Sequence, residues 1–437
     1  MQTIPINSDR LLSDLRELRK IGGVGSGVVR QAFSDSDMEA RYWLKKRFED
    51  AHLDTTIDGV GNVLGRSRKI GTSILLGSHS DTQPEGGWLD GALGVIYGLE
   101  VARALHEYDN TSQLSVDVVS WQDEESNFLS CLGSRSWCGT LNPDLEKLAV
   151  SREGEKLEHA LKRVGLNNVP RLKIEENRYL GYLEAHIEQG CYLEEASEKI
   201  GIVSAIVGIR AFIISFKGEQ NHAGTTTMKR RKDAATAMFE TAYRINNQFP
   251  SLANETTVWT IGNATVEPGA SSIVPGAAEL TLQFRDQDER ILDSLEEEVR
   301  KIVSEIENKT EIKVDVRPGR EVIRPSKMDS SFQKHLSKAA QVITPNAWRH
   351  MPSAAGHDPM VIHEKLPCGM LFIPSIRGIS HNFDEDSHIN TKTQINDQNK
   401  SIKIIWKSYK KDKNIDEQLK TNPNFQDKKT LDQIFYE

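Results

Sequence analysis

The sequence has few cysteines and no long apolar segment. Only four of its 437 residues are cysteine, and no two form a CxxC pair, so neither a zinc ribbon nor a dithiol redox centre is expected. No run approaches the ~18 to 20 apolar residues that cross a bilayer. The start, MQTIPINSDRLLSDLR, has no basic segment followed by an apolar one, as a secretory signal would. We therefore expect a cytoplasmic protein.

An excess of basic residues is also absent. The chain has 55 Lys and Arg against 63 Asp and Glu, a formal net charge of -8, which disfavours binding to nucleic acid. With 38% apolar and 27% charged residues, the composition is that of an ordinary globular protein and excludes collagen-like, disordered and disulfide-scaffold classes. At about 150 residues per domain, the length indicates two or three domains.

The first part of the chain alternates between strand-like and helix-like segments. Apolar runs at 73–77 (SILLG) and 114–120 (LSVDVVS) predict buried strands, and 91–105 between them is apolar almost all round, as in a helix packed on a sheet. This βαβ pattern predicts an α/β domain with its ligand site beyond the carboxyl ends of the strands.

The segment 206–322 has a different order of elements. Strand-like 211–216, helical 231–247, strands 256–261 and 279–284, helix 288–307 and strand 311–316 give the order βαββαβ of a ferredoxin-like unit. Because strand-like sequence resumes at 370–373, we interpret 206–322 as an insertion between two parts of a first domain, 1–205 and 323–390. The segment 391–437 is polar, lacks glycine and fits neither domain.

Two clusters follow the predicted strands directly. In GSHSDTQPEGGWLDG (77–91), His79 could bind a metal ion while Asp81 fixes the tautomer of its ring; Asp90 is either a further ligand or the N-cap of the next helix. In WQDEES (121–126), Glu124 and Glu125 are adjacent, so one could bind metal while the other handles protons. The alternative for this pair is a solvated acidic loop.

Two further histidines complete a possible ligand set. His186 lies in HIEQG (186–190) and His381 in GISHNFDED (378–386). A single histidine is more often structural than metal-binding. Three histidines with two carboxylates, however, suit a site for two divalent ions such as Zn, Mn or Co.

The predicted insertion contains a third group of polar residues. NHAGTTTMKRRKDAA (221–235) includes His222, Arg231 and Asp233, which could equally be surface groups around a helix start. Arg210 and Arg285 lie at the ends of predicted strands, where a guanidinium group could bind a substrate carboxylate or simply be exposed.

Taken together, these motifs resemble one known family. HSDTQPEGGWLDG, DEE, HIEQG, NHAGTTTM, VPG with a following FRD, AAGHD and GISHN occur over about residues 10–390 in the order found in the hydantoinase/carbamoylase branch of the M20 metal-dependent amidohydrolases. That branch includes N-carbamoyl-L-amino acid hydrolases, allantoate amidohydrolases and β-ureidopropionases. The resemblance implies a zinc-peptidase-like α/β catalytic domain with an inserted lid that also forms a homodimer.

The resemblance also implies roles for individual residues. One metal ion would be held by His79, Asp90 and His186 and a second by Asp90, Glu125 and His381, with Glu124 as the general base. His222 would stabilise the oxyanion in the site of the partner subunit. The remaining implied residues are the substrate ligands Arg210, Ser272, Arg285, Gly356 and His357, and the supporting residues Asp81 and Gln189.

The chain departs from the family pattern at three places. Ser272 stands where relatives have asparagine beside the arginine at 285, Thr227 replaces a proline, and the residues after 390 do not match. The expected function is hydrolysis of an N-carbamoyl-L-amino acid to ammonia, CO2 and the amino acid, with allantoate or ureidopropionate as alternative substrates. A non-catalytic binding protein and a peptidase of the wider family are further alternatives.

Overall fold

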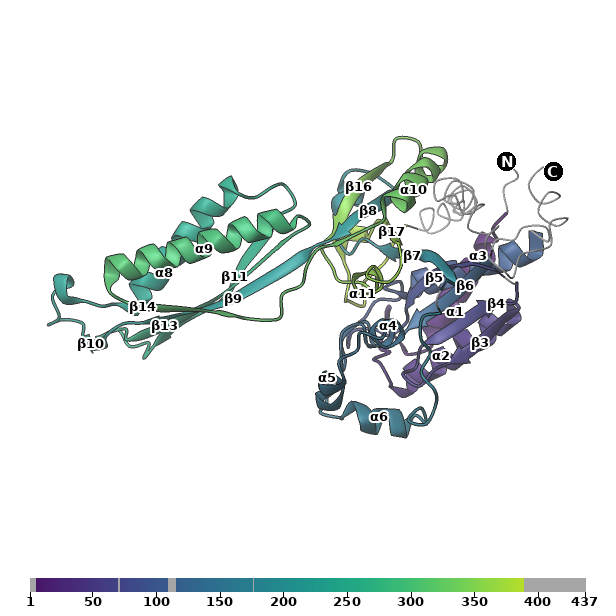
Figure 1. Cartoon of the computed structure of the whole chain (residues 1–437), viewed down its shortest axis with the longest axis horizontal. Coiled ribbons are helices and arrows are strands. Elements are labelled where there is room, and N and C mark those ends of the chain that lie inside the picture. Colours follow the sequence, from purple (N-terminus) through teal and green to yellow (C-terminus); the bar gives the residue numbers. More distant parts are fainter. Residues whose placement is uncertain (1–4, 70, 109–114, 176, 389–437) are drawn as a thin grey trace. The chain divides into compact units, whose positions relative to one another are not determined.

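A computed structural model describes residues 5–69, 71–108, 115–175 and 177–388. The chain divides into two compact units (Figure 1). Unit 2 comprises Ala205–Lys327 and Pro352–Gly356, and unit 1 comprises the rest of the described chain. The polar segment 391–437, singled out in the sequence, lies outside the described residues.

Unit 1 is built on a mixed sheet in the order β8-β17-β7-β5-β6-β4-β3, with β16 pairing with β8. At one edge the two-residue strand β15 pairs with the end of β8, at Ala205 and Ile206, within the limits of unit 2. The four central strands of the mixed sheet, β17, β7, β5 and β6, are parallel, and the strands beyond them pair antiparallel. The strands of this sheet are β3 (Leu53–Ile57), β4 (Val63–Ser67), β5 (Ser73–His79), β6 (Ser115–Trp121), β7 (Tyr179–Ile187), β8 (Ile200–Ile206), β15 (Ser326–Lys327), β16 (Trp348–Ser353) and β17 (Cys368–Ile373). A separate short hairpin joins β1 (Gly23–Val24) to β2 (Gly27–Val28).

The longer helices of unit 1 cover this sheet and share one hydrophobic core with it. The helices are α1 (Ser8–Lys20), α2 (Asp35–Asp50), α3 (Ala92–Tyr108), α4 (Leu132–Cys138), α5 (Pro143–Leu148), α6 (Leu157–Arg163), α7 (Tyr192–Glu195), α10 (Ser330–Ile343) and α11 (Pro359–Ile362). Glycine allows α3 to approach the strands closely, because a Cβ at Gly94 would lie 2.5 Å from the carbonyl oxygen of Ala185. The predicted strand-helix-strand of 73–120 is therefore present, and α3 begins two residues after Asp90.

Unit 2 contains a four-stranded antiparallel sheet in the order β11-β13-β9-β14. Its elements are β9 (Gly208–Lys217), α8 (Ala234–Gln248), β11 (Val258–Glu267), β13 (Ala277–Asp286), α9 (Glu289–Thr310) and β14 (Lys313–Pro318), together with the short pair β10 (Asn221–His222) and β12 (Ile273–Val274) and the 3-10 turns at Met228–Arg230 and Phe249–Ser251. This is the split βαβ order predicted for the insertion. Alternate residues of β9 and β13 are buried against α8 and α9, and their residues on the other, open face are partly exposed in the described part of the chain.

The limits of unit 2 differ from the predicted 206–322 in one informative way. The segment 352–356, expected in the first domain, belongs to unit 2, because the N–H of Val207 donates to the carbonyl of Ser353 and the guanidinium of Arg285 donates to the carbonyl of Ala354. Pairing between segments this far apart leaves no periodic signal in the sequence. Within the described ranges, no helix is long and apolar enough to cross a membrane.

A buried arginine connects α2 to the end of β6. The side chains of Arg41 and Asp37 are both fully buried and form an ion pair at 3.0 Å. Arg41 also donates to the main-chain carbonyls of Gly61 at 2.9 Å and Trp121 at 3.2 Å. It therefore fixes the end of β6, from which the loop containing Glu124 departs.

We expect Arg41→Met to lower the free energy of unfolding by about 3 to 5 kcal/mol, because it leaves Asp37 and several carbonyls buried without their partner. Urea denaturation followed by circular dichroism measures this loss. Lys46→Met is the control, since Lys46 pairs with Asp50 at the surface of the same helix, where an ion pair contributes ~0 to 1 kcal/mol. A loss below about 1 kcal/mol in Arg41→Met would contradict this account.

Candidate metal centre and active site

The predicted ligands lie at the carboxyl end of the parallel strands of unit 1. His79 is the last residue of β5, His186 is the penultimate residue of β7, and Glu124 follows the end of β6 by three residues. Since β5 pairs in parallel with both β6 and β7, these three strands end at the same edge of the sheet. The α/β pattern predicted a ligand site at this edge.

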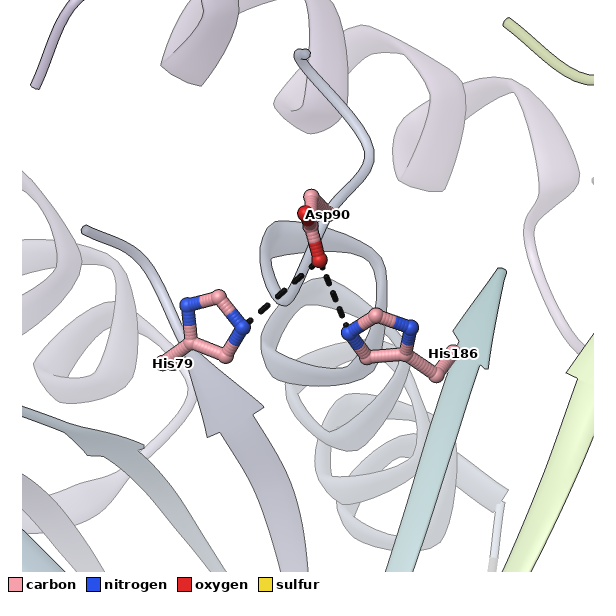
Figure 2. Close-up of side chains that lie close together, drawn as sticks. All are labelled: His79, Asp90 and His186. Atoms are coloured by element: carbon pink, nitrogen blue, oxygen red, sulfur yellow. Dashed lines mark ion pairs between the residues drawn. The ribbon is translucent and has the colours of Figure 1, made fainter. Parts of the chain in front are cut away.

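Asp90 lies between two histidine rings at this edge (Figure 2). Its Oδ1 is 3.0 Å from Nε2 of His186 and 3.7 Å from Nε2 of His79, and all three side chains are at most 3% exposed. Next to it, Gly91 has a φ of 63°, and a Cβ there would lie 2.5 Å from the ring of His79. Only glycine therefore fits beside this ring, and the carboxylate of Asp90 points at the histidines rather than serving the sequence alternative of a simple N-cap.

The second oxygen of Asp90 faces a second group of residues. Its Oδ2 is 3.2 Å from Nε2 of His381, and the same ring nitrogen is 3.5 Å from Oε2 of Glu125. Both sets, His79 with Asp90 and His186, and Asp90 with Glu125 and His381, bring their ligand atoms within 4.8 Å of one another. Asp90 belongs to both sets, as a carboxylate that bridges two ions would.

Glu124 faces the first of these sets from the other side. Its Oε2 is 3.8 Å from Nε2 of His79. The preceding residue, Asp123, has a φ of 55° and accepts three main-chain N–H bonds at 2.7 to 2.9 Å, from Asn127, Phe128 and Leu129. Because the loop is this tight, the adjacent side chains of Glu124 and Glu125 point at different partners, His79 and His381. The division of roles between two neighbouring carboxylates requires such an arrangement.

The pKa values of the centre show a concentration of buried negative charge. Burial, reinforced by the charge of Asp90, raises the pKa of Glu125 to about 8. Burial and the charge of Glu125 raise the pKa of Glu124 well above its ordinary value. Burial alone would also raise the pKa of Asp90, but hydrogen bonds from His186 and His381 hold it well below that of a free carboxyl. A cation at this centre would offset the repulsion among these carboxylates.

The donor set fits divalent cations. Oε1 of Glu125 is buried and accepts no hydrogen bond among the described residues, which leaves it available to a cation. Imidazole nitrogens mixed with carboxylate oxygens favour Zn, Mn or Co over Mg or Ca. His79, Asp90, Glu125, His186 and His381 are therefore the residues that would hold metal.

The two predicted supporting residues behave differently. Nε2 of Gln189 donates to Oδ2 of Asp90 at 3.2 Å and lies 3.3 Å from Nε2 of His381, so it steadies the bridging carboxylate. For Asp81 the expectation needs correction. Nδ1 of His79 bonds to the main-chain carbonyl of Asp81 at 3.0 Å, while the Asp81 carboxylate is 3.8 Å away and accepts the N–H of Glu125. The tautomer of His79 is thus fixed by backbone.

Sequence reasoning missed two side chains that hold the ligands. The buried carboxylate of Glu385 accepts the main-chain N–H groups of Leu89 at 3.1 Å and Asp90 at 3.0 Å. Nε2 of Gln83 donates to Oε2 of Glu125 at 2.7 Å. Both lie inside motifs already noted, and the only signal available was that polar residues near a ligand often orient it.

The two arginines predicted to bind substrate are not equivalent. Arg210 is buried and its guanidinium group pairs with three carboxylates of α9, those of Glu289, Asp293 and Glu296. These three carboxylates offset its charge, so Arg210 stabilises unit 2, while its buried Nε–H has no hydrogen-bond partner among the described residues. Arg210 stays a predicted substrate ligand. Arg285 donates from Nε to Gln283 at 3.0 Å and pairs with no carboxylate of the described chain, so it stays a predicted substrate ligand.

His222 and Ser272 lie together on the pair β10 and β12. His222 is opposite Ile273, and the carbonyl of Ser272 accepts the N–H of Ala223 at 2.9 Å. The sequence placed Ser272 beside Arg285, but Arg285 lies near the far end of β13, a strand of 10 residues or about 30 Å. Within one chain Ser272 therefore accompanies His222 and not Arg285, and it stays a predicted substrate ligand.

The neighbours of His222 in the motif have local roles. Asp233 caps α8 by accepting the N–H of Thr236 at 3.1 Å, and Arg231 donates to the carbonyls of Thr226 and Ala223.

The two residues predicted to line the substrate pocket, Gly356 and His357, fall in different units. His357 is buried in unit 1 with its ring 4.5 Å from that of His186, whereas Gly356 is exposed and belongs to unit 2.

The sequence matches the model of Peptidase family M20/M25/M40 over residues 75–401. The match spans the strands from β6 to β17, the candidate ligand set and the insertion. The chain belongs to this family.

Similar proteins place it more closely within the M20 family. It is 32% identical to N-carbamoyl-L-amino-acid amidohydrolase of Pseudomonas sp. (strain NS671) over 89% of this chain and 96% of that protein. It is also 32% identical to allantoate amidohydrolase of Escherichia coli (strain K12), over 83% of this chain and 89% of that protein. A hydantoinase/carbamoylase family amidase from Burkholderia phymatum has a crystal structure with a TM-score of 0.86 and 45% identity, covering 92% of this chain and 99% of that one.

These findings agree with the resemblance drawn from the motifs. The chain is an amidohydrolase of the carbamoylase/allantoate group, with the α/β fold and mixed sheet of M20 peptidases. Enzymes of this family are generally metal-dependent, and the groups around Asp90 are the candidate metal ligands of this one.

We expect Asp90→Ala to lose most of the bound metal, because Asp90 faces both ligand groups. Metal content per chain, measured by plasma mass spectrometry after dialysis against Mn²⁺ and desalting, tests this. Asp384→Ala is the control, since Asp384 is exposed in the loop that contains His381 and should leave metal content unchanged. Retention of two ions per chain by folded Asp90→Ala would exclude a bridging role.

Proposed function

We propose that this chain is a dinuclear metal-dependent hydrolase of linear C–N amide bonds that converts an N-carbamoyl-L-amino acid to ammonia, CO2 and the amino acid. The observation that supports this most directly is the position of Asp90, within 3.7 Å of three histidine rings that approach its two oxygens from different elements. Zn, Mn or Co ions suit the donors. Two such ions would polarise a carbonyl group and lower the pKa of an attacking water.

Glu124 is the proposed general base. It is adjacent to the ligand Glu125 yet faces His79, so it can take a proton at the centre without serving as a ligand. The raised pKa of its carboxyl suits a group that accepts a proton from water and then delivers it to departing ammonia. Its side chain is only 10% exposed, which keeps bulk water from competing for that proton.

His222 is proposed to donate a hydrogen bond to the oxygen on which charge develops. Its Nδ1 accepts the main-chain N–H groups of Gly224 at 3.0 Å and Thr225 at 3.1 Å. In the neutral ring the proton is therefore on Nε2, which is left as a donor held in a fixed direction. A single preorganised donor of this kind contributes about 3 to 4 kcal/mol to an acyl-transfer transition state.

The position of His222 supports a site shared between two chains. His222 and Arg285 lie at opposite ends of β13 in the same unit, too far apart to contact one small substrate together. A homodimer in which one chain supplies His222 and the other Arg285 resolves this. Phe239 and Tyr243, four residues apart on α8, are 61% and 69% exposed, and β11 is an edge strand of the described sheet. These apolar groups and the open edge are the proposed dimer surface.

Arg285 favours a substrate with a carboxylate, which N-carbamoyl amino acids, allantoate and ureidopropionate all have. Allantoate amidohydrolase and β-ureidopropionase activities are therefore the second candidates, favoured by the similarity to the allantoate enzyme of Escherichia coli. A binding protein without catalysis would not require a buried base beside a complete ligand set.

We expect the Mn²⁺-, Zn²⁺- or Co²⁺-loaded protein to release ammonia from N-carbamoyl-L-amino acids faster than from allantoate or ureidopropionate. Glu124→Gln should keep its metal and lose at least about 100-fold in kcat, the scale of general-base catalysis. Glu364→Gln, a change at an exposed glutamate, is the control. An ammonia-coupled assay on each metal form measures both.

Two results would overturn these assignments. Release of ammonia from none of the three substrate classes by any metal form would reject the proposed reaction. Near-normal turnover by Glu124→Gln would remove Glu124 as the base while leaving the reaction intact.

A mixture of two inactive variants tests the shared site. Glu124→Gln and His222→Ala chains, unfolded together and refolded, should regain up to about a quarter of the wild-type activity, because half of the dimers are mixed and one of their two sites has both groups intact. Co-purification through two different affinity tags shows that mixed dimers form. No recovery in purified mixed dimers would place His222 in the site of its own chain, or in none.

A further inference from the structure

Unit 2 contains several arginines without an acidic partner among the described residues, and one of them, Arg320, lies close to Arg285. In this unit, Arg210, Arg244, Arg290, Arg300 and Arg317 all pair with carboxylates. Arg320 forms no ion pair with any described residue. Burial lowers the pKa of Arg285, and the charge of Arg320 lowers it further, so the two guanidinium groups are near enough to repel each other.

A bulge in the edge of the sheet positions Arg320. The N–H of Gly319 bonds to the carbonyl of Ala211 at 2.8 Å, and Ile323 and Ile209 exchange two hydrogen bonds at 2.8 and 3.0 Å. Between these pairings, one residue of β9 lies opposite three residues, 320–322. Extra residues of this kind push a strand out of register and redirect its side chains, often beside active sites.

The bulge brings Arg320 to a cavity on the open face of the sheet. This cavity has a volume of about 360 Å³ and is lined by Arg320, Gln283, Thr281 and Thr260, with Ala211 and Ile213 at its floor. Oε1 of Gln283 accepts from Nε of Arg285, so one side chain contacts the predicted substrate arginine and lines the cavity as well. The cavity therefore begins where the substrate carboxylate is proposed to bind.

The two carboxylates of β13, the strand that contains Arg285, already accept hydrogen bonds from other side chains. Glu279 accepts from Ser215 and Arg317, and Asp286 accepts from Thr257. Two nearby cations without an acid destabilise a fold, and an anionic ligand that binds both removes that cost.

We propose that Arg320 forms a second anion-binding subsite next to Arg285, so that the preferred substrate is an N-carbamoyl amino acid with an acidic side chain. This inference rests on the proposed function, since it takes Arg285 as the ligand of the α-carboxylate. The side-chain carboxylate of an aspartate or glutamate derivative lies a short methylene chain away and would reach the cavity. Gln283 and the two threonines then supply further hydrogen bonds.

The test compares acids with their neutral amides. N-carbamoyl-L-glutamate and N-carbamoyl-L-aspartate should have a kcat/KM at least tenfold above that of N-carbamoyl-L-glutamine and N-carbamoyl-L-asparagine. Arg320→Gln should lower kcat/KM for the acids by about 10- to 100-fold, mainly through KM, and change that for the amides less than threefold. Arg317→Gln, a change at a paired arginine of β14 three residues before Arg320, should alter neither.

Binding separates this inference from the proposed reaction. Calorimetric titration of the Mn²⁺-loaded Glu124→Gln protein with N-carbamoyl-L-glutamate should give a Kd that rises at least tenfold when Arg320→Gln is added. If no ureido compound is hydrolysed but this difference is found, the reaction assignment fails and the subsite stands. Equal kcat/KM for acids and amides in the wild type, or equal losses for both in Arg320→Gln, would overturn the subsite.

Discussion

The structure around the site depends on holding one buried carboxylate, that of Asp90, among three histidines. His79 comes from β5, His186 from β7 and His381 from the loop after β17, so three separate segments meet at this side chain. The main-chain N–H of Asp90 donates to the carboxylate of Glu385, which lies four residues after His381. The loop before α3 and the last described loop are thus fixed to each other by both the side chain and the backbone of one residue.

In the proposed function, unit 2 brings hydrogen-bond donors to the substrate. Its long strands separate His222 from Arg285 by the length of β13. A rigid sheet holds each group in a fixed direction but cannot fold both onto one small molecule. The same rigidity that orients the donors therefore favours a site made by two chains.

The sequence predicted the elements and ligands that depend on local pattern or on strand ends. His79 and Glu124 follow predicted apolar strands, and parallel strands end at one edge, so their meeting could be foreseen. His186 joins them because it lies at the end of β7, a strand that the sequence analysis did not single out. The contacts of Arg210 and Ser272 could not be foreseen. Arg210 is neutralised by carboxylates of a helix about 80 residues away, and Ser272 is placed by the pairing of β10 with β12. Neither contact leaves a periodic signal, and the same holds for the segment 352–356.

The buried carboxylates also determine how metal binding responds to pH. With its pKa raised to about 8, Glu125 is largely protonated at pH 7 when no cation is bound. Burial lowers the pKa of His186, but the hydrogen bond and charge of Asp90 together with the charge of Glu184 outweigh it and raise this pKa to about 9, so His186 is protonated as well. A cation binds only the deprotonated ligands, so it must displace these protons, and its affinity rises as the pH increases towards 9. Protons and metal ions therefore compete for the same buried ligand atoms.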